Sequence, residues 1–228
     1  MNKPKAIFNW SSGKDSAMAL YKTLQENKFD VQCLLTSINS QFDRISMHGV
    51  RTSLLEKQAE SIGLPLYKLM LPEMPSMDVY SEVVGNAMSN FKSQGVEYSI
   101  FGDIFLEDLK TYREEQLAKV GLKAEFPIWK QPTRQLMENF IDLGFKAIVV
   151  CVDESKLDKS FVGRLLDKDF LRDIPENVDP CGENGEYHSF VFEGPIFTIP
   201  ITFTRGEVVY KTYEQSEKSF GFYYCDLE

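Results

Sequence analysis

The sequence is poor in cysteine and has no long apolar run. Its 228 residues include four cysteines, and these lie far apart, at Cys33, Cys151, Cys181 and Cys225. Because no Cys-x-x-Cys pair is present, we expect neither a zinc cluster nor a redox pair. We expect the thiols to be reduced, as they are in the cytoplasm. No apolar run approaches the roughly 20 residues of a membrane span. Residues 1–5 are not followed by the apolar segment of a signal peptide. We therefore expect a cytoplasmic protein that does not enter a membrane.

Positive charge is also scarce. The chain has 25 Lys and Arg against 34 Asp and Glu, so its formal net charge is −9. Bulk charge of this sign argues against non-specific binding to nucleic acid or to an anionic membrane. A small basic groove for an RNA would still be compatible with it. Hydrophobic residues make up 43% of the chain, which is typical of a globular protein.

Two familiar phosphate-binding motifs are missing. A Walker loop has a glycine five residues before its Gly-Lys pair and Ser or Thr after the pair. Here the pair Gly13-Lys14 has Phe8 at the first of these positions and Asp15 at the second. The dinucleotide fingerprint G-x-G-x-x-G is absent as well. Any phosphate is therefore expected to bind in a loop of another kind.

One short segment does have the character of a phosphate-binding loop. It consists of Ser11, Ser12, Gly13, Lys14, Asp15 and Ser16. The apolar run before it, 6–10, predicts a buried strand, and apolar residues at helical spacing follow it in 17–24. A turn of small residues before a helix directs backbone N–H groups and the positive helix end at one point, which suits a phosphate. A carboxylate in such a turn, Asp15, is explained if a divalent metal lies beside the phosphate.

The sequence predicts an α/β fold. Apolar runs at 6–10, 31–35, 66–71 and 98–101 predict strands, and the segments between them show helical spacing. Such alternation is typical of a mostly parallel sheet, which binds ligands beyond the carboxyl ends of its strands. If the strands lie in the order 3-2-1-4, the loop 11–16 and the pair Gly102-Asp103 face one crevice.

The pattern changes near residue 130. We expect a nucleotide-binding domain at 1–130 and a smaller α/β domain at 131–228. Within the second domain, periodicity predicts helices and short strands. The helices are expected at 136–141 and 161–170, and the strands at 146–152, 189–192, 196–203 and 207–210. The aromatic tail after Tyr213 is expected to fray or to pack on a partner chain.

The segment 179–189 is dense in reactive side chains. It combines carboxylates, an amide, a thiol, a phenol and an imidazole with two glycines, just before a predicted strand. Binding residues often concentrate in loops of this kind. Its candidates for catalysis are Glu183, Glu186 and His188. For Cys181, a buried structural thiol is favoured over a nucleophile, because no partner base is evident.

Together these segments resemble a known family. The hexamer resembles the pyrophosphate loop of the N-type ATP pyrophosphatases, the PP-loop superfamily, usually Ser-Gly-Gly-x-Asp-Ser, with Ser12 replacing the first glycine. The run Gly-Glu-x-Gly-Glu-x-His at 182–188 looks like that of the diphthine–ammonia ligase family and its bacterial relatives. Gly102-Asp103-Ile104 and Pro127-Ile128-Trp129 also fit that family. The resemblance extends over residues 5–205.

The resemblance implies an adenine-nucleotide α-hydrolase-like (Rossmann-like) domain with a smaller α/β domain. It implies an ATP-dependent ligase that adenylates a carboxylate, releases pyrophosphate, and amidates the acyl adenylate with ammonia, releasing AMP. Nucleotide contacts are implied at Ser11, Ser12, Gly13, Lys14, Asp15, Ser16, Thr36, Ser37, Gly102 and Asp103, with Mg²⁺ at Asp15 and Asp103. Catalytic roles are implied for Lys14, Asp15, Glu183, Glu186 and His188.

Two other functions remain open from the sequence. The same loop could support RNA thiolation, for which Cys181 is the one plausible sulfur carrier. The chain could also be a regulatory module that holds ATP or AMP without turnover. The acceptor could be a small molecule or a protein, and free ammonia is the simplest nitrogen donor because no glutaminase domain is visible. A homo-oligomer is compatible with all of these functions.

Overall fold

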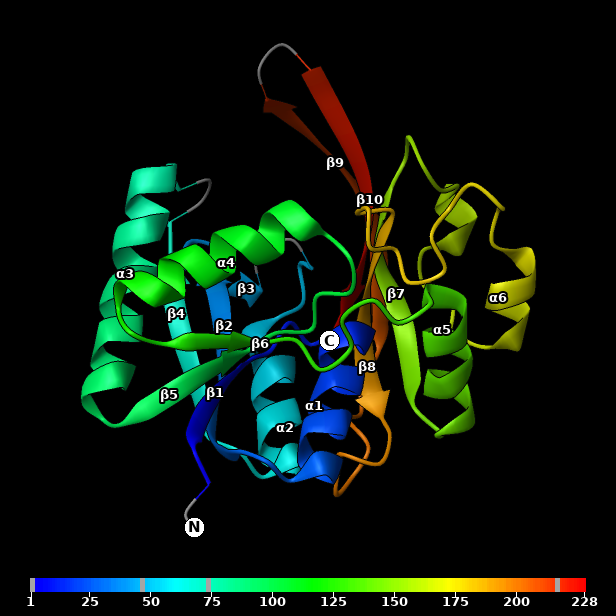
Figure 1. Ribbon diagram of the computed structural model, residues 1–228. Coiled ribbons are helices and arrows are strands. Elements are labelled where there is room, and N and C mark those ends of the chain that lie inside the picture. The colour runs from blue at the N-terminus through cyan, green and yellow to red at the C-terminus, as the bar shows by residue number, and fades with distance from the viewer. Residues whose placement is uncertain (1–2, 46–47, 73–74, 216–217) are drawn as a thin grey trace.

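Figure 1 shows the computed structural model, which describes residues 3–45, 48–72, 75–215 and 218–228. The first half of the chain forms a six-stranded sheet. Its five parallel strands lie in the order β4-β2-β1-β5-β6, which confirms the expected order 3-2-1-4 for the first four predicted strands. These strands are β1 (Lys5–Asn9), β2 (Asp30–Asn39), β4 (Leu66–Leu71), β5 (Val96–Ile100) and β6 (Lys123–Glu125). The short β3 (Arg44–Ile45) pairs antiparallel with the end of β2.

Helices cover both faces of this sheet, because neighbouring residues of a strand point to opposite sides. Ala6 and Phe8 of β1 pack in one apolar cluster with α1 (Lys14–Glu26) and α2 (Thr52–Ile62). Ile7 packs in a second cluster with α3 (Met77–Ser93) and α4 (Glu107–Lys119). Figure 1 shows these two pairs of helices on opposite sides of the strands. The expected α/β fold with a mostly parallel sheet is confirmed.

The second half forms a four-stranded antiparallel sheet in the order β8-β7-β10-β9. Its strands are β7 (Lys146–Asp153), β8 (Tyr187–Glu193), β9 (Arg205–Gln215) and β10 (Lys218–Leu227). The helices α5 (Thr133–Asp142) and α6 (Lys168–Asp173) lie together beside β7 (Figure 1). The fold is therefore a Rossmann-like parallel-sheet unit joined to a smaller α/β unit, as the sequence predicted.

Three predicted elements of the second half are wrong. The helix expected at 161–170 is broken, because Gly163 has a φ of +79° and Leu165 bridges to Ile148 of β7. A 3₁₀ turn, η1 (Lys159–Phe161), and the later α6 replace that helix. The segment 196–203 is irregular, because Thr198 bonds to the end of α2 instead of to a strand. The expected fraying of the aromatic tail is also wrong, because residues 218–227 form β10, which pairs with β7 and β9; packing of the tail on a partner chain stays a prediction.

Two short strands were missed. The strands β3 and β6 have two and three residues, too few for an alternating pattern to be recognised in the sequence. Within the described ranges, none of the helices has the length and apolar character needed to cross a lipid bilayer.

The strand β8 lies against the loop at the start of α1, and this contact positions the site. The backbone N–H of Val191 donates to the Ser12 carbonyl at 2.9 Å, and the Lys14 N–H donates to Ser189 Oγ at 3.2 Å. The buried Gln58 amide bridges the two segments by donating to the carbonyls of Ser12 and Val191. The loop 11–16 and the segment 187–191 therefore reach one place from opposite halves of the chain.

Candidate active site

The loop 11–16 makes a tight turn from β1 into α1. Ser12 is fully buried and has a φ of +70°, the left-handed region that favours glycine. Gly13 then caps the helix in an extended conformation. The serine therefore accepts a backbone conformation that a glycine would adopt more easily, and the chain enters α1 with the first amides of the helix directed outward at its start.

The end of β5 lies directly against this loop. A Cβ atom on Gly102 would be 3.0 Å from the backbone carbon of Asp15 and 3.0 Å from the backbone nitrogen of Ser16. At that distance a side chain at position 102 would require the backbone of the loop to shift. The expectation that Gly102-Asp103 and the loop share one crevice is therefore confirmed.

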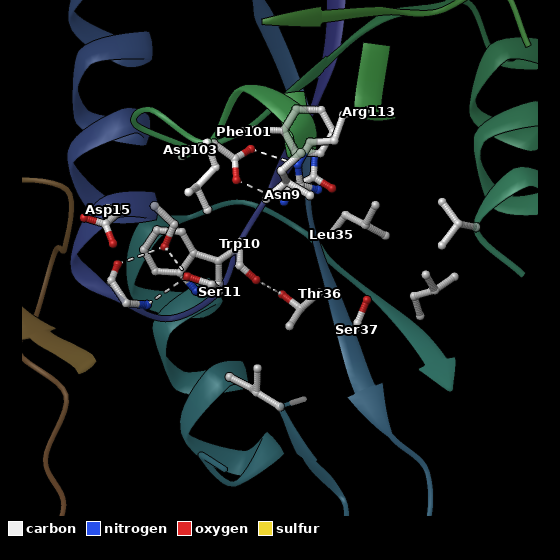
Figure 2. Close-up of a pocket in the computed structure, with 18 of the residues that line it drawn as sticks. Asn9, Trp10, Ser11, Asp15, Leu35, Thr36, Ser37, Phe101, Asp103 and Arg113 are labelled. Carbon is white, nitrogen blue, oxygen red and sulfur yellow. Dashed lines mark hydrogen bonds and ion pairs between the residues drawn. The ribbon is translucent and has the colours of Figure 1, made fainter. Parts of the chain in front are cut away.

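A cavity of about 630 Å³ opens at the carboxyl ends of β1, β2 and β5, a volume typical of small-molecule sites. Ser12 and Glu186 are the two candidates that do not line it. The candidates that line it are Ser11, Gly13, Lys14, Asp15, Ser16, Thr36, Ser37, Gly102, Asp103, Glu183 and His188. Figure 2 shows the labelled candidates of the first half along one wall.

The buried Lys14 and the partly exposed Asp15 form an ion pair at the start of α1. Lys14 Nζ lies 2.8 Å from Asp15 Oδ2 and 5.0 Å from the centre of the Tyr187 ring. Burial alone lowers the pKa of Lys14, but Asp15 and Tyr187 outweigh it, and the pKa stays above its usual value. Asp15 Oδ1 is buried and has no hydrogen-bond partner among the described residues. The site therefore holds a fixed positive charge and one carboxylate oxygen still able to accept a cation.

Asp103 is paired with Arg113 of α4, a residue that the sequence analysis did not select. Arg113 Nη2 donates to Asp103 Oδ1 at 3.1 Å, and Arg113 Nε lies 2.8 Å from Asp103 Oδ2 (Figure 2). The guanidinium group also lies 4.4 Å from the centre of the Phe101 ring. The charged pattern of α4 resembles a solvated face, so only the tertiary pairing reveals Arg113 as a residue of the cavity.

The far part of the cavity is more apolar. Leu35 and Leu69 line it, together with Met88 of α3. Thr36 Oγ1 donates to the Trp10 carbonyl at 2.6 Å (Figure 2), so this hydroxyl is already used inside the protein. A contact from Thr36 to a ligand would therefore come mainly from its backbone, as the resemblance implies.

Glu183 reaches the cavity from the loop before β8. Its Oε1 accepts a hydrogen bond from the Ile104 N–H at 2.8 Å, next to Asp103. Burial and the negative charge of Asp15 raise the pKa of Glu183 to about 7. This carboxyl group can therefore take up and release a proton close to neutral pH.

His188 faces His48, and these are the two histidines of the chain. Their ring centroids are 4.6 Å apart, and His48 Nδ1 lies 3.3 Å from the Ser189 carbonyl oxygen. Burial and the charge of Lys14 lower the pKa of His188 to about 4, and burial and His188 lower the pKa of His48. Both imidazoles are therefore neutral at pH 7. His48 is a site residue that sequence spacing alone did not single out.

Glu186 and Cys181 hold the loop instead of facing the cavity. The buried Glu186 carboxylate accepts hydrogen bonds from the N–H groups of Asp179 and Asn184 and from the Asn184 side chain. Cys181 Sγ lies 3.4 Å from the Thr133 carbonyl, and burial raises the pKa of its thiol. Cys181 is thus a buried, protonated thiol, as the sequence favoured.

The comparisons with known proteins agree with this architecture. Residues 4–124 match the family model "Diphthamide synthase N-terminal domain", and residues 132–222 match "Diphthamide synthase C-terminal domain". Diphthine–ammonia ligases of Bos taurus and Homo sapiens are each 25% identical over 187 residues, which cover 75% of this chain and 70% of each relative. The Schizosaccharomyces pombe ligase is 24% identical over 186 residues, and the match covers 74% of this chain and 30% of that longer protein. The chain therefore belongs to the diphthamide synthase (diphthine–ammonia ligase) family of the PP-loop superfamily.

Proposed function

We propose that this protein is an ATP-dependent ligase that adenylates a carboxylate, releasing pyrophosphate, and then amidates it with ammonia. The observation that carries the proposal is the Lys14–Asp15 ion pair at the start of α1, in the same cavity as Glu183. The residues that would activate the nucleotide and the residue that would accept a proton thus line the same cavity. The family relationship supports ATP and ammonia as the substrates.

The first step would take place at the loop 11–16. A carboxylate oxygen of the acceptor attacks the α-phosphorus, the bond from that phosphorus to the bridging oxygen breaks, and pyrophosphate leaves with the electron pair. The charge of Lys14 and the N–H groups at the start of α1 would stabilise the departing pyrophosphate. The backbone at Thr36 and Ser37, beside the apolar wall, would hold the adenine.

Asp15 fits a divalent cation such as Mg²⁺, because its buried Oδ1 has no partner among the described residues. Asp103 faces the same cavity, although Arg113 engages both of its oxygens. Within the described ranges, no three Asp, Glu, His or Cys side chains gather as a metal set. Mg²⁺ is often held by one or two carboxylates plus substrate phosphates. Bound there, the ion would offset the negative charge of the phosphates.

The second step would use the loop before β8. The ammonia nitrogen attacks the acyl carbon, the bond from that carbon to the AMP oxygen breaks, and the nitrogen must lose a proton. Glu183 suits this transfer, because its pKa of about 7 lets it accept a proton near neutral pH. Neutral His188 would accept a hydrogen bond from the attacking nitrogen, and Glu186 would hold the loop in position.

The two units would divide this work. We propose that residues 1–130 bind ATP and that residues 131–228 supply the acceptor side. RNA thiolation is the weaker alternative, because Cys181 is buried, does not line the cavity, and has a raised thiol pKa.

Substitution of Lys14 or Asp15 distinguishes two hypotheses: that the protein is a catalyst, and that it only binds a nucleotide as a sensor. ATP binding and AMP formation would be measured for Lys14→Ala and Asp15→Ala, with Mg²⁺, ammonium and a mixture of small carboxylic acids. We expect AMP formation to fall by about 100-fold or more, even at ATP concentrations that saturate each variant. Lys57→Ala, on the exposed face of α2, is the matched control and should be unchanged. Tight ATP binding without AMP formation, even with cell extract added as a source of acceptors, would contradict the proposal.

A further inference from the structure

The strand β9 leaves a long edge of the second sheet open. It has 11 residues, and β10 is its one strand partner in the described part of the chain. Every residue from 205 to 212 is exposed, including the apolar Val208, Val209 and Tyr210. Figure 1 shows the hairpin of β9 and β10 extending out from the body of the protein.

The backbone groups that face this open edge can be identified. The Gly221 carbonyl accepts a hydrogen bond from the Glu154 N–H at 3.0 Å, so the polar groups of Gly221 point toward β7. Thr212 lies opposite Gly221 in the antiparallel pair, so its N–H and C=O point away from β10. By alternation along the strand, those of Val208 and Tyr210 also point outward. Three consecutive outward positions are thus available for a further strand.

The usual protections of an edge strand are weak here. Edge strands are commonly blunted by proline, by a bulge or by charges. From 205 to 215 the strand contains no proline. Its register with β10 shifts once, between Arg205 and Val208 near the start of the strand, and is regular from Val208 to Gln215. Another strand can therefore form backbone hydrogen bonds with this edge.

The sequence of β9 is complementary to itself. If two copies pair antiparallel about Val209, Val208 lies opposite Tyr210 of the second copy and Glu207 lies opposite Lys211. Glu207 and Lys211 then occupy pairs without mutual backbone hydrogen bonds, where facing side chains are closest. The twofold symmetry produces each ion pair and each apolar pair twice, and it closes the assembly at two chains.

We propose that this protein forms a twofold symmetric dimer in which two β9 strands pair edge to edge. The two four-stranded sheets then join into one sheet of eight strands. The partner that this edge fits is a second copy of the chain, and the register is set by Glu207 and Lys211. This inference does not depend on the proposed function.

The test is the mass of the intact protein in solution, measured by sedimentation velocity over a range of concentrations. The wild type is expected to sediment at twice the chain mass of 26.2 kDa. Thr212→Pro removes an outward N–H that the fold does not use, and it should give a monomer with an unchanged far-ultraviolet spectrum.

A charge exchange tests the register even if Thr212→Pro fails to fold. Lys211→Glu places like charges opposite each other and should weaken the dimer at least tenfold, whereas Glu207→Lys combined with Lys211→Glu should restore it. Lys57→Glu reverses a charge on the exposed face of α2. It is the control and should leave the dimer intact. A monomeric wild type, or a dimer that none of the β9 variants weakens, would overturn the proposal. A dimer that Lys211→Glu weakens but the double exchange does not restore would overturn the Val209 register.

Discussion

His48 and His188 come from opposite halves of the chain, and their rings face each other at a tilt of 32° with centroids 4.6 Å apart. Each is placed by β8: His188 belongs to that strand, and His48 bonds to the carbonyl of the next residue, Ser189. The contact joins the segment after β3 to β8. Because both rings are partly buried and neutral, it also makes this contact between the two halves sensitive to acid.

Stability should fall in acid because of these rings. The pKa of His188 is about 4 in the folded protein, against 6.5 as its ordinary value. Below pH 6.5 the unfolded chain therefore binds more protons than the folded one, so stability decreases as the pH falls from 6.5 to 4. We expect His188→Gln to remove on the order of 2 kcal/mol of this loss. The free energy of unfolding of the wild type and the variant, measured with urea at pH 7 and at pH 4.5, gives the size of this loss in each protein. Equal pH slopes for the variant and the wild type would contradict the burial of a neutral ring.

Ser12→Gly should be tolerated, because Ser12 already has a φ of +70°. Glycine relieves a left-handed strain of about 1–2 kcal/mol, and its greater freedom in the unfolded chain costs about 0.5–1 kcal/mol. We therefore expect unchanged or slightly higher stability and retained ATP binding. Ser12→Val should lose about 2 kcal/mol or more, because a β-branched residue fits this region worst. Thermal unfolding and ATP titration of both variants decide it, and a stable Ser12→Val that binds ATP normally would show that the turn is not required.

Gly102→Ala should disturb the nucleotide site. The added carbon would meet the backbone of Asp15 and Ser16 at 3.0 Å, so the start of α1 must move. We expect ATP affinity to fall about tenfold or more, which corresponds to about 1.4 kcal/mol. Gly85→Ala in α3 is the matched control, because it adds the same methyl group to another part of the cavity wall with nothing within 4 Å of the added carbon, and alanine in a helix stabilises by about 0.5–1 kcal/mol. Equal ATP affinities for the two variants would argue against a binding role for this contact.

Substitutions of Glu183 and Glu186, in the loop before β8, should have different effects. Glu186 is buried and accepts three hydrogen bonds, so Glu186→Ala should cost about 3 kcal/mol or more of stability. Glu183→Gln keeps the shape of a half-buried side chain and should leave stability within about 1 kcal/mol. Its amidation rate should fall, and the increase of rate through pH 7 should disappear, because the titrating group is gone. A Glu183→Gln enzyme with the wild-type pH profile would exclude Glu183 as the proton acceptor.

Much of the first half could be predicted from the sequence, and less of the second. Four parallel strands follow from buried apolar runs, and the order assumed for them, which brings the loop 11–16 and Asp103 to one crevice, is the order observed. The second half is antiparallel and irregular, so its elements depend on tertiary contacts such as the one between Thr198 and α2. The same holds in the site. Short motifs marked Lys14, Asp15 and Glu183. Arg113 becomes recognisable only through its pairing with Asp103, although the two residues are just 10 positions apart, and His48 only through its contact with His188 in the other half of the chain.

The nucleotide products formed from ATP test the central claim most directly. ³¹P nuclear magnetic resonance would follow ATP and Mg²⁺ with the protein, ammonium and the acceptor mixture, beside the Asp15→Ala variant. The account predicts AMP and pyrophosphate with the wild type and neither with the variant. ADP and phosphate as the wild-type products would contradict cleavage between the α- and β-phosphates, and with it the proposed ligase.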